Sequence, residues 1–181
     1  FTLATGLSEP SGLAVDPTNG FLYVANKDNQ EIRKYTVNGE LVTFWSLGVV
    51  PYDVEVDSLG NCFVLITGSS QIRKYSSSGQ LIRTIPFPAG RFAGDATGLT
   101  VDSLARIHIG ASGTPGSYYY LVMDSTGVVV RETALGPNPV PYDIVVDEEL
   151  NSWLLRSGFS VYVERRDSTG AFLGSFGSIG T

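Results

Sequence analysis

The sequence predicts an all-β protein built from four copies of one unit. Two markers recur with a shared period, and the short apolar segments between them show no helical periodicity. The first marker is a Val-Asp pair, whose aspartates Asp16, Asp57, Asp102 and Asp147 are 41, 45 and 45 residues apart. The second is a turn glycine, at Gly39, Gly79, Gly127 and Gly170, with spacings of 40, 48 and 43. A unit of about 40–45 residues has the length of one four-stranded propeller blade.

Each unit is interpreted as four short strands. The first alternates apolar residues and ends in the Val-Asp pair, whose aspartate opens a turn. The second is almost continuously apolar, as expected for a strand buried on both faces: Phe21–Ala25, Cys62–Ile66, Ile107–Gly110 and Trp153–Leu155. The third contains Ile-Arg-Lys-Tyr in the first two copies, at 32–35 and 72–75. The fourth follows the turn glycine: Leu41–Leu47, Gln80–Ile85, Val128–Thr133 and Ala171–Phe176.

The repeated pattern is Pro-x-Gly/Asp-apolar-x-Val-Asp, an apolar strand, Ile-Arg-Lys-Tyr, x-Gly and a closing Phe-Gly. It is clearest in Pro10–Gly48 and Pro51–Ile85 and resembles the NHL-repeat family of β-propellers. The third and fourth copies depart from it, because Tyr120–Met123 and Val163–Arg166 replace the Ile-Arg-Lys-Tyr strand. The resemblance implies an NHL-type β-propeller with four four-stranded blades. Such propellers usually close with six blades, so we expect the chain to be part of a larger one.

We expect residues 1–181 to form a single propeller domain or segment. Residues 1–8 are interpreted as the last strand of a preceding blade, because Phe1–Gly6 aligns with the strand ending Thr43–Gly48. The blades are then 9–50, 51–95, 96–140 and 141–181. The alternative is that Phe1–Gly6 covers a sheet edge, since exposed edges invite pairing with another chain.

Composition excludes several classes of function. The 12 basic and 18 acidic residues give a net charge of −6, which argues against a nucleic-acid partner. No apolar run approaches the roughly 18 residues of a membrane span, and the single cysteine, Cys62, excludes an internal disulfide. Low charge with much glycine, serine, threonine and tyrosine favours an extracellular or cell-surface location, and a cytosolic one is the alternative.

Some NHL propellers bind single-stranded RNA through a basic surface. Here the pairs Arg33-Lys34, Arg73-Lys74 and Arg165-Arg166 are isolated, and we assign them to a solvated blade face.

The first candidate site is an irregular loop face in the third unit. The longest connections on that face are Pro86–Asp95 and Ala111–Ser117, the second followed by three tyrosines. Loops on a rigid scaffold often carry function, and tyrosine and arginine are favoured contact residues. Arg91, Phe92, Tyr118 and Tyr119 are therefore a candidate patch for a protein or small ligand. The alternative is a tolerated surface insertion.

The second candidate site is the mouth of the propeller channel. Tyr52-Asp53 and Tyr142-Asp143 begin the first strands of their units, which are innermost in a propeller. Two carboxylates there could contribute to a Ca²⁺ site, although Ca²⁺ takes six to eight oxygen ligands. The favoured interpretation is that each carboxylate accepts neighbouring backbone N–H groups, so we expect no metal and no cofactor.

No residue set predicts catalysis. His108, the only histidine, aligns with Tyr23, Phe63 and Trp153 and is expected to be a packed, hydrogen-bonded ring. Some NHL-like propellers, the peptide-amidating lyases, use histidine-bound zinc, which one histidine does not support. The four Val-Asp aspartates recur in every copy and are expected to cap turns.

The functional prediction is a non-enzymatic scaffold for protein or ligand binding. One alternative is a propeller lyase or hydrolase with a metal at the channel mouth. Another is a building block of a filament or assembly.

Overall fold

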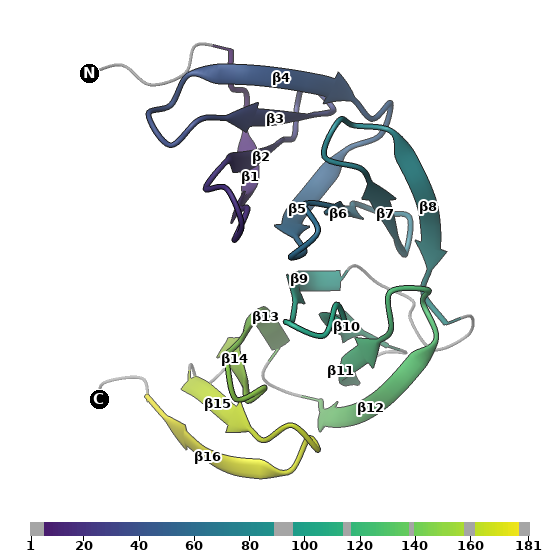
Figure 1. Cartoon of the computed structure of the whole chain (residues 1–181). Coiled ribbons are helices and arrows are strands. Elements are labelled where there is room, and N and C mark those ends of the chain that lie inside the picture. Colours follow the sequence, from purple (N-terminus) through teal and green to yellow (C-terminus); the bar gives the residue numbers. More distant parts are fainter. Residues whose placement is uncertain (1–5, 89–95, 114–116, 138–139, 158–161, 178–181) are drawn as a thin grey trace. The chain divides into compact units, whose positions relative to one another are not determined.

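The structure is a computed structural model that describes residues 6–88, 96–113, 117–137, 140–157 and 162–177 (Figure 1). Its sixteen strands form four four-stranded sheets, and every regular element in these ranges is a strand. The predicted all-β class with four four-stranded blades is thus confirmed. The chain divides into two compact units, Phe1–Pro86 and Phe87–Thr181, which are described separately. The described ranges hold no helix long and apolar enough to cross a membrane.

The first unit contains two antiparallel sheets. Each is a meander in which every strand pairs with the next one along the chain. Blade 1 consists of β1 (Pro10–Val15), β2 (Leu22–Asn26), β3 (Glu31–Tyr35) and β4 (Leu41–Ser46). Blade 2 consists of β5 (Pro51–Val56), β6 (Cys62–Ile66), β7 (Gln71–Tyr75) and β8 (Leu81–Pro86).

The core of the first unit lies between its two blades. Blade 1 contributes Ala14, Tyr23, Ala25, Ile32 and Leu47, and blade 2 contributes Val54, Val56, Cys62, Val64, Ile66 and Tyr75. Every residue of β6 is buried, as its continuous apolar sequence predicts. Cys62 is fully buried, in agreement with its interpretation as a small hydrophobic residue.

The second unit has the same architecture. Blade 3 consists of β9 (Ala96–Val101), β10 (Ile107–Ser112), β11 (Tyr118–Met123) and β12 (Val129–Gly136). Blade 4 consists of β13 (Val140–Val146), β14 (Ser152–Ser157), β15 (Tyr162–Arg166) and β16 (Phe172–Phe176). A core between them joins Tyr120, Val122 and Leu135 of blade 3 to Ile144 and Leu154 of blade 4.

Two kinds of turn close the sheets, and both follow from the repeated markers. In the turn after the first strand of each blade, the aspartate carboxylate accepts backbone N–H groups; Asp57 Oδ1, for example, accepts from Leu59 and Asn61. The expected capping role of these aspartates is therefore confirmed. The four turn glycines have φ between 81° and 96°. Residues that carry a Cβ are disfavoured in this region of backbone conformation.

One connection is shorter than the sequence predicts. The expected loop began at Ala111, but β10 continues to Ser112, and Ala111 and Ser112 pair with Tyr119 and Tyr118 of β11. Both residues are small and lie next to a glycine, which suggests a loop, but their pairing with β11 continues the ladder. The connection between the two strands is therefore 113–117.

Candidate functional site

The predicted partner-binding patch is only partly described. Arg91 and Phe92 lie outside the described residues. Tyr118 and Tyr119 are half-buried residues of β11 rather than loop residues. The patch as a whole stays a prediction.

The two aspartates predicted at a channel mouth each bind their own backbone. Asp53 Oδ1 accepts from the N–H of Val54 at 2.9 Å, and Asp143 Oδ1 accepts from the N–H of Ile144 at 2.8 Å. The tyrosines before them differ in exposure: Tyr52 is half-buried and Tyr142 is exposed. The aspartates belong to different units, so no joint site is derived from them.

Each aspartate instead marks a close approach between neighbouring blades. A Cβ built on Gly12 of β1 would lie 2.5 Å from Asp53 Oδ1 and 2.7 Å from Asp53 Cα. A Cβ on Gly98 of β9 would lie 2.9 Å from Asp143 Cα. These distances leave no room for a side chain. Glycine is therefore required where the first strand of one blade approaches the first strand of the next blade.

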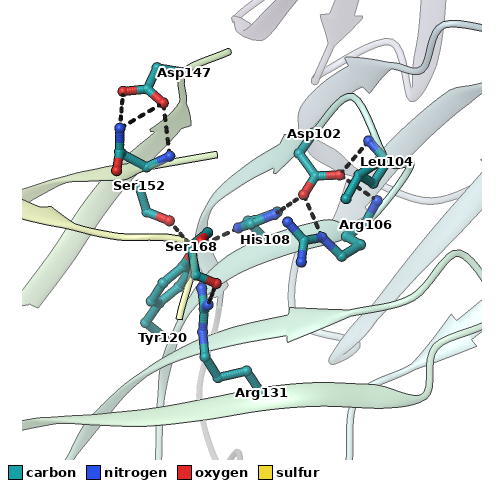
Figure 2. Close-up of polar contacts among 10 residues, drawn as sticks. Asp102, Leu104, Arg106, His108, Tyr120, Arg131, Asp147, Ser152 and Ser168 are labelled. Atoms are coloured by element: carbon teal, nitrogen blue, oxygen red, sulfur yellow. Dashed lines mark hydrogen bonds and ion pairs between the residues drawn. The ribbon is translucent and has the colours of Figure 1, made fainter. Parts of the chain in front are cut away.

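A buried polar network occupies the second unit, and sequence reasoning did not predict its extent. It consists of Asp102 directly after β9, His108 on β10, Tyr120 on β11 and Ser152 on β14 (Figure 2). His108 Nε2 lies 2.9 Å from Asp102 Oδ2, and His108 Nδ1 lies 2.6 Å from the Tyr120 hydroxyl. That hydroxyl also bonds the Ser152 hydroxyl. His108 is 1% exposed, which confirms its prediction as a packed, hydrogen-bonded ring.

The chemistry of the partners fixes the direction of these hydrogen bonds. The carboxylate of Asp102 can only accept, so His108 Nε2–H donates to it. In the neutral ring, which the lowered pKa of His108 favours, Nδ1 accepts from the Tyr120 O–H, and the Tyr120 oxygen accepts from Ser152 and, at 3.1 Å, from Arg131. This assignment leaves neither ring nitrogen unused.

Electrostatics agree with a neutral ring beside an ionised carboxylate. Burial lowers the pKa of His108, and the hydrogen bond from its ring to Asp102 opposes that effect without cancelling it. Burial would raise the pKa of Asp102, but hydrogen bonds from His108 and from the backbone and side chain of Arg106 hold that pKa at about 2. Burial raises the pKa of Tyr120. The network is therefore set in one protonation state at neutral pH.

The arrangement resembles a proton relay, but its burial makes it a structural crosslink. The side chains of Asp102, His108, Tyr120 and Ser152 are all sealed from solvent or nearly so. No substrate can reach such a ring without local opening of the blade. Among the bonds that join blade 3 to blade 4, two come from this network: the Tyr120–Ser152 bond, and a bond from Arg131 to the Ser168 carbonyl. The network thus fastens two neighbouring blades.

In blades 1, 2 and 4, a basic side chain lies over an aromatic ring at the position that this network occupies in blade 3. Lys34 Nζ lies 5.0 Å from the centre of the Tyr23 ring, Lys74 lies 4.6 Å from that of Phe63, and Arg165 lies 4.8 Å from that of Trp153. Lys34 is buried, and burial lowers its pKa. The assignment of these basic pairs to a solvated face is wrong for Lys34 and Lys74, because the ammonium group of each lies over an aromatic ring of the adjacent strand. In blade 3 the matching position, opposite His108, is Val122.

Blade 1 carries a hollow on the face opposite blade 2. It has a volume of about 710 Å³ and is lined mainly by apolar residues. The lining includes Leu13 and Val15 of β1, Leu22 and Val24 of β2, and Tyr35 of β3. Leu13 and Val15 are 61% and 60% exposed, although they belong to a regular strand. The hollow is therefore an apolar face of the blade 1 sheet.

The described part of the chain was also compared with the ligand sets of metal sites. Among the described residues, no group of three or more His, Cys, Asp or Glu side chains is placed to hold an ion. The suggestion of Ca²⁺ at Asp53 and Asp143 stays untested.

Comparisons with known proteins agree with the architecture. A sequence model of the NHL repeat matches residues 7–35. No curated protein sequence matches the chain significantly. Similar solved structures include the hydrazine synthase of Kuenenia stuttgartiensis (14% identity, TM-score 0.74), a streptogramin B lyase (18%, 0.73) and the virginiamycin B lyase of Staphylococcus aureus (17%, 0.73).

These similarities cover nearly all of the chain but only part of each relative. The alignments include 99%, 98% and 100% of this chain and 51%, 57% and 59% of those chains, in the same order. The chain therefore spans about half to three fifths of their length. At such identities the similarity establishes the fold alone. The chain is a β-propeller protein that contains an NHL repeat at residues 7–35.

Proposed function

We propose that the chain is a non-enzymatic propeller scaffold that binds a protein through the apolar face of blade 1. The observation that carries the proposal is the 710 Å³ hollow on that face. Monomeric soluble proteins rarely leave large contiguous apolar patches in water, and such patches often mark protein-interaction sites. A rigid sheet that presents Leu13 and Val15 to solvent gains free energy when another protein covers it.

The polar groups of the chain support binding rather than catalysis. Replacing a histidine by alanine gives a catalytically inactive virginiamycin B lyase. The single histidine of this chain is buried, and both of its ring nitrogens are engaged in hydrogen bonds. A general acid or base must reach the proton that it transfers, and His108 does not reach solvent. The lyase alternative would therefore need another group.

Composition supports the setting of such a scaffold. Only 17% of the residues are charged, and 21 of the 181 are glycine. We propose an extracellular or cell-surface location on this basis.

The binding face is tested with the apolar dye bis-ANS. We expect the dye to bind the dilute chain and to lose most of its fluorescence in Leu13→Glu, because a carboxylate in the hollow is costly to desolvate. Leu59→Glu is the matched control, since Leu59 is equally apolar and 81% exposed but lies in a turn of blade 2. Equal dye binding by the two variants would place the apolar site elsewhere.

The absence of lyase chemistry is tested separately. The purified chain is incubated with quinupristin, the compound bound to the inactive lyase of Staphylococcus aureus. We expect the compound to remain intact by mass spectrometry, with and without added Ca²⁺. Conversion by the chain that exceeds the rate in buffer would overturn the non-enzymatic proposal.

A further inference from the structure

The four Val-Asp aspartates differ in the partners of their second carboxylate oxygen, Oδ2. In blades 2, 3 and 4 this oxygen accepts hydrogen bonds from two side chains, namely Asn61 and Lys74, Arg106 and His108, and Asn151 and Trp153. In blade 1, Asp16 Oδ2 is buried and has no hydrogen-bond partner among the described residues. The aspartate of blade 1 therefore lacks a donor that its three counterparts have.

The sequence of the turn explains the difference. In every blade the N–H of the aspartate donates to the carbonyl of the residue that closes the turn, which is Asn61, Arg106 or Asn151 in blades 2 to 4 and Phe21 in blade 1. The side chains at this position donate to Oδ2 in blades 2 to 4, whereas a phenylalanine ring carries no donor. Asp16 is only 1% exposed. A carboxylate oxygen so deeply buried is unfavourable without a hydrogen bond.

The lysine of blade 1 does not supply the missing donor. In blade 2, Lys74 Nζ lies 3.3 Å from Asp57 Oδ2. In blade 1, Lys34 Nζ instead lies over the ring of Phe21, 4.4 Å from its centre. Burial lowers the pKa of Lys34 and the charge of Asp16 opposes this effect, so the two opposite charges are near each other. A bound ion of either sign would be repelled by one of them, which favours a neutral ligand.

A second buried polar group without a partner lies close by. The Tyr23 side chain is 0% exposed, and its hydroxyl has no hydrogen-bond partner among the described residues. Burial raises the pKa of Tyr23, and the negative charge of Asp16 adds to this effect, which places the two groups near each other. The site thus offers an unused O–H donor beside an unused carboxylate acceptor.

Blade 2 covers this site and leaves space beside the carboxylate. Gly60 is buried, and a Cβ built on it would lie 3.5 Å from Asp16 Oδ2 and 3.7 Å from the Ser77 Cβ. Both are ordinary van der Waals distances, so one further atom fits there without a clash. Buried water molecules typically occupy such positions, where they bond polar groups that lack other partners.

We propose that the junction of blades 1 and 2 binds a single water molecule, which donates to Asp16 Oδ2 and accepts from the Tyr23 hydroxyl. The strand register aligns Tyr23 with His108, whose Nε2–H donates to Asp102 Oδ2. The water thus supplies in blade 1 the hydrogen bond that an imidazole supplies in blade 3. This inference is independent of the proposed binding face.

Magnetic relaxation dispersion of water oxygen-17 tests the site, because it counts water molecules that remain bound longer than the protein tumbles. Phe21→Asn introduces the amide that bonds the aspartate in blades 2 and 4. We expect this variant to hold one long-lived water fewer than the wild type. Leu59→Asn is the matched control, since it adds the same amide at an exposed turn position and should keep the wild-type number. The same number in the wild type and in Phe21→Asn would overturn the proposal.

Tyr23→Phe gives a second test whose sign decides. Phenylalanine fits the position, because Phe63 occupies it in blade 2. Loss of a hydroxyl that bonds the water should lower the urea midpoint of the first unit by about 0.5 M. Loss of an unpartnered buried hydroxyl would instead raise it. Trp45 reports this unfolding in a Trp153→Phe background. A midpoint that rises or stays unchanged overturns the water bridge, whatever the result with bis-ANS.

Discussion

Replacing His108 by phenylalanine should make the stability of the second unit nearly independent of pH between 7.5 and 5.5. Phenylalanine fits the site, because the matching residue of blade 2 is Phe63 in the same register. The folded structure lowers the pKa of His108, so the unfolded chain binds a proton more readily than the folded one. Stability from this group is therefore fully present well above the unfolded pKa of about 6.5 and declines as pH falls.

The magnitude follows from the linkage relation. One proton taken up on unfolding changes the free energy of unfolding by about 1.4 kcal/mol per pH unit. Between pH 7.5 and 5.5 the wild-type chain should lose up to about 1.4 kcal/mol, because the unfolded histidine titrates in that range. His108→Phe removes two hydrogen bonds, one to an ionised carboxylate, at a cost of about 2–4 kcal/mol at pH 7.5. Its stability should then change little down to pH 5.5.

The two tryptophans of the chain allow each unit to be followed separately. Trp45 lies in the first unit and Trp153 in the second. Urea unfolding is therefore measured by fluorescence at a series of pH values in a Trp45→Phe background, where Trp153 reports alone. Ser152→Ala is the control, because it shortens the network but keeps the histidine and hence the pH dependence. The reasoning is refuted if His108→Phe retains the wild-type decline between pH 7.5 and 5.5.

Two further substitutions test the packing of the blades by the same urea unfolding. Gly12→Ala should destabilise the first unit by about 1–3 kcal/mol, because the new Cβ meets the backbone of Asp53; an unchanged midpoint would mean that the strands separate freely there. Glu164→Gln should destabilise the second unit by about 3–5 kcal/mol, since Arg156 Nη1 lies 2.7 Å from Glu164 Oε2 and both are buried. The exposed Glu148→Gln should have no effect, and a similar loss in both variants would contradict a special role for the buried pair.

The sequence predicts the fold because its signals are local. A Val-Asp pair specifies a strand end and a turn within a few residues, and Asp57 Oδ1 indeed accepts from Leu59 and Asn61. The turn glycines specify a backbone conformation that other residues adopt at a cost. Such signals recur four times, so chance departures in one copy, such as Tyr120–Met123, do not hide the period.

The polar network was less predictable because its members come together only through register and blade stacking. Alignment of the repeats placed His108 in the sheet correctly. Its partner Tyr120 lies 12 positions further along the chain, and Ser152, which bonds Tyr120, lies 44 positions further and belongs to the next blade. One signal was present in the sequence: Val122 replaces the lysine of the third strand in the copy where histidine replaces the aromatic residue. Burial of Lys34 was missed because its isolated charge resembles a surface residue.

The meander connectivity of each blade has a consequence for how the chain folds. Every ladder joins strands that are consecutive in sequence. Forming the contacts inside a blade therefore closes only short loops, which has a small entropic cost. Proteins dominated by local contacts fold faster than those whose strands pair across long separations. Hairpins can form on a microsecond scale, whereas the packing of one blade on the next joins more distant residues. We therefore expect stacking of the blades, rather than formation of their strands, to be the slow step of folding.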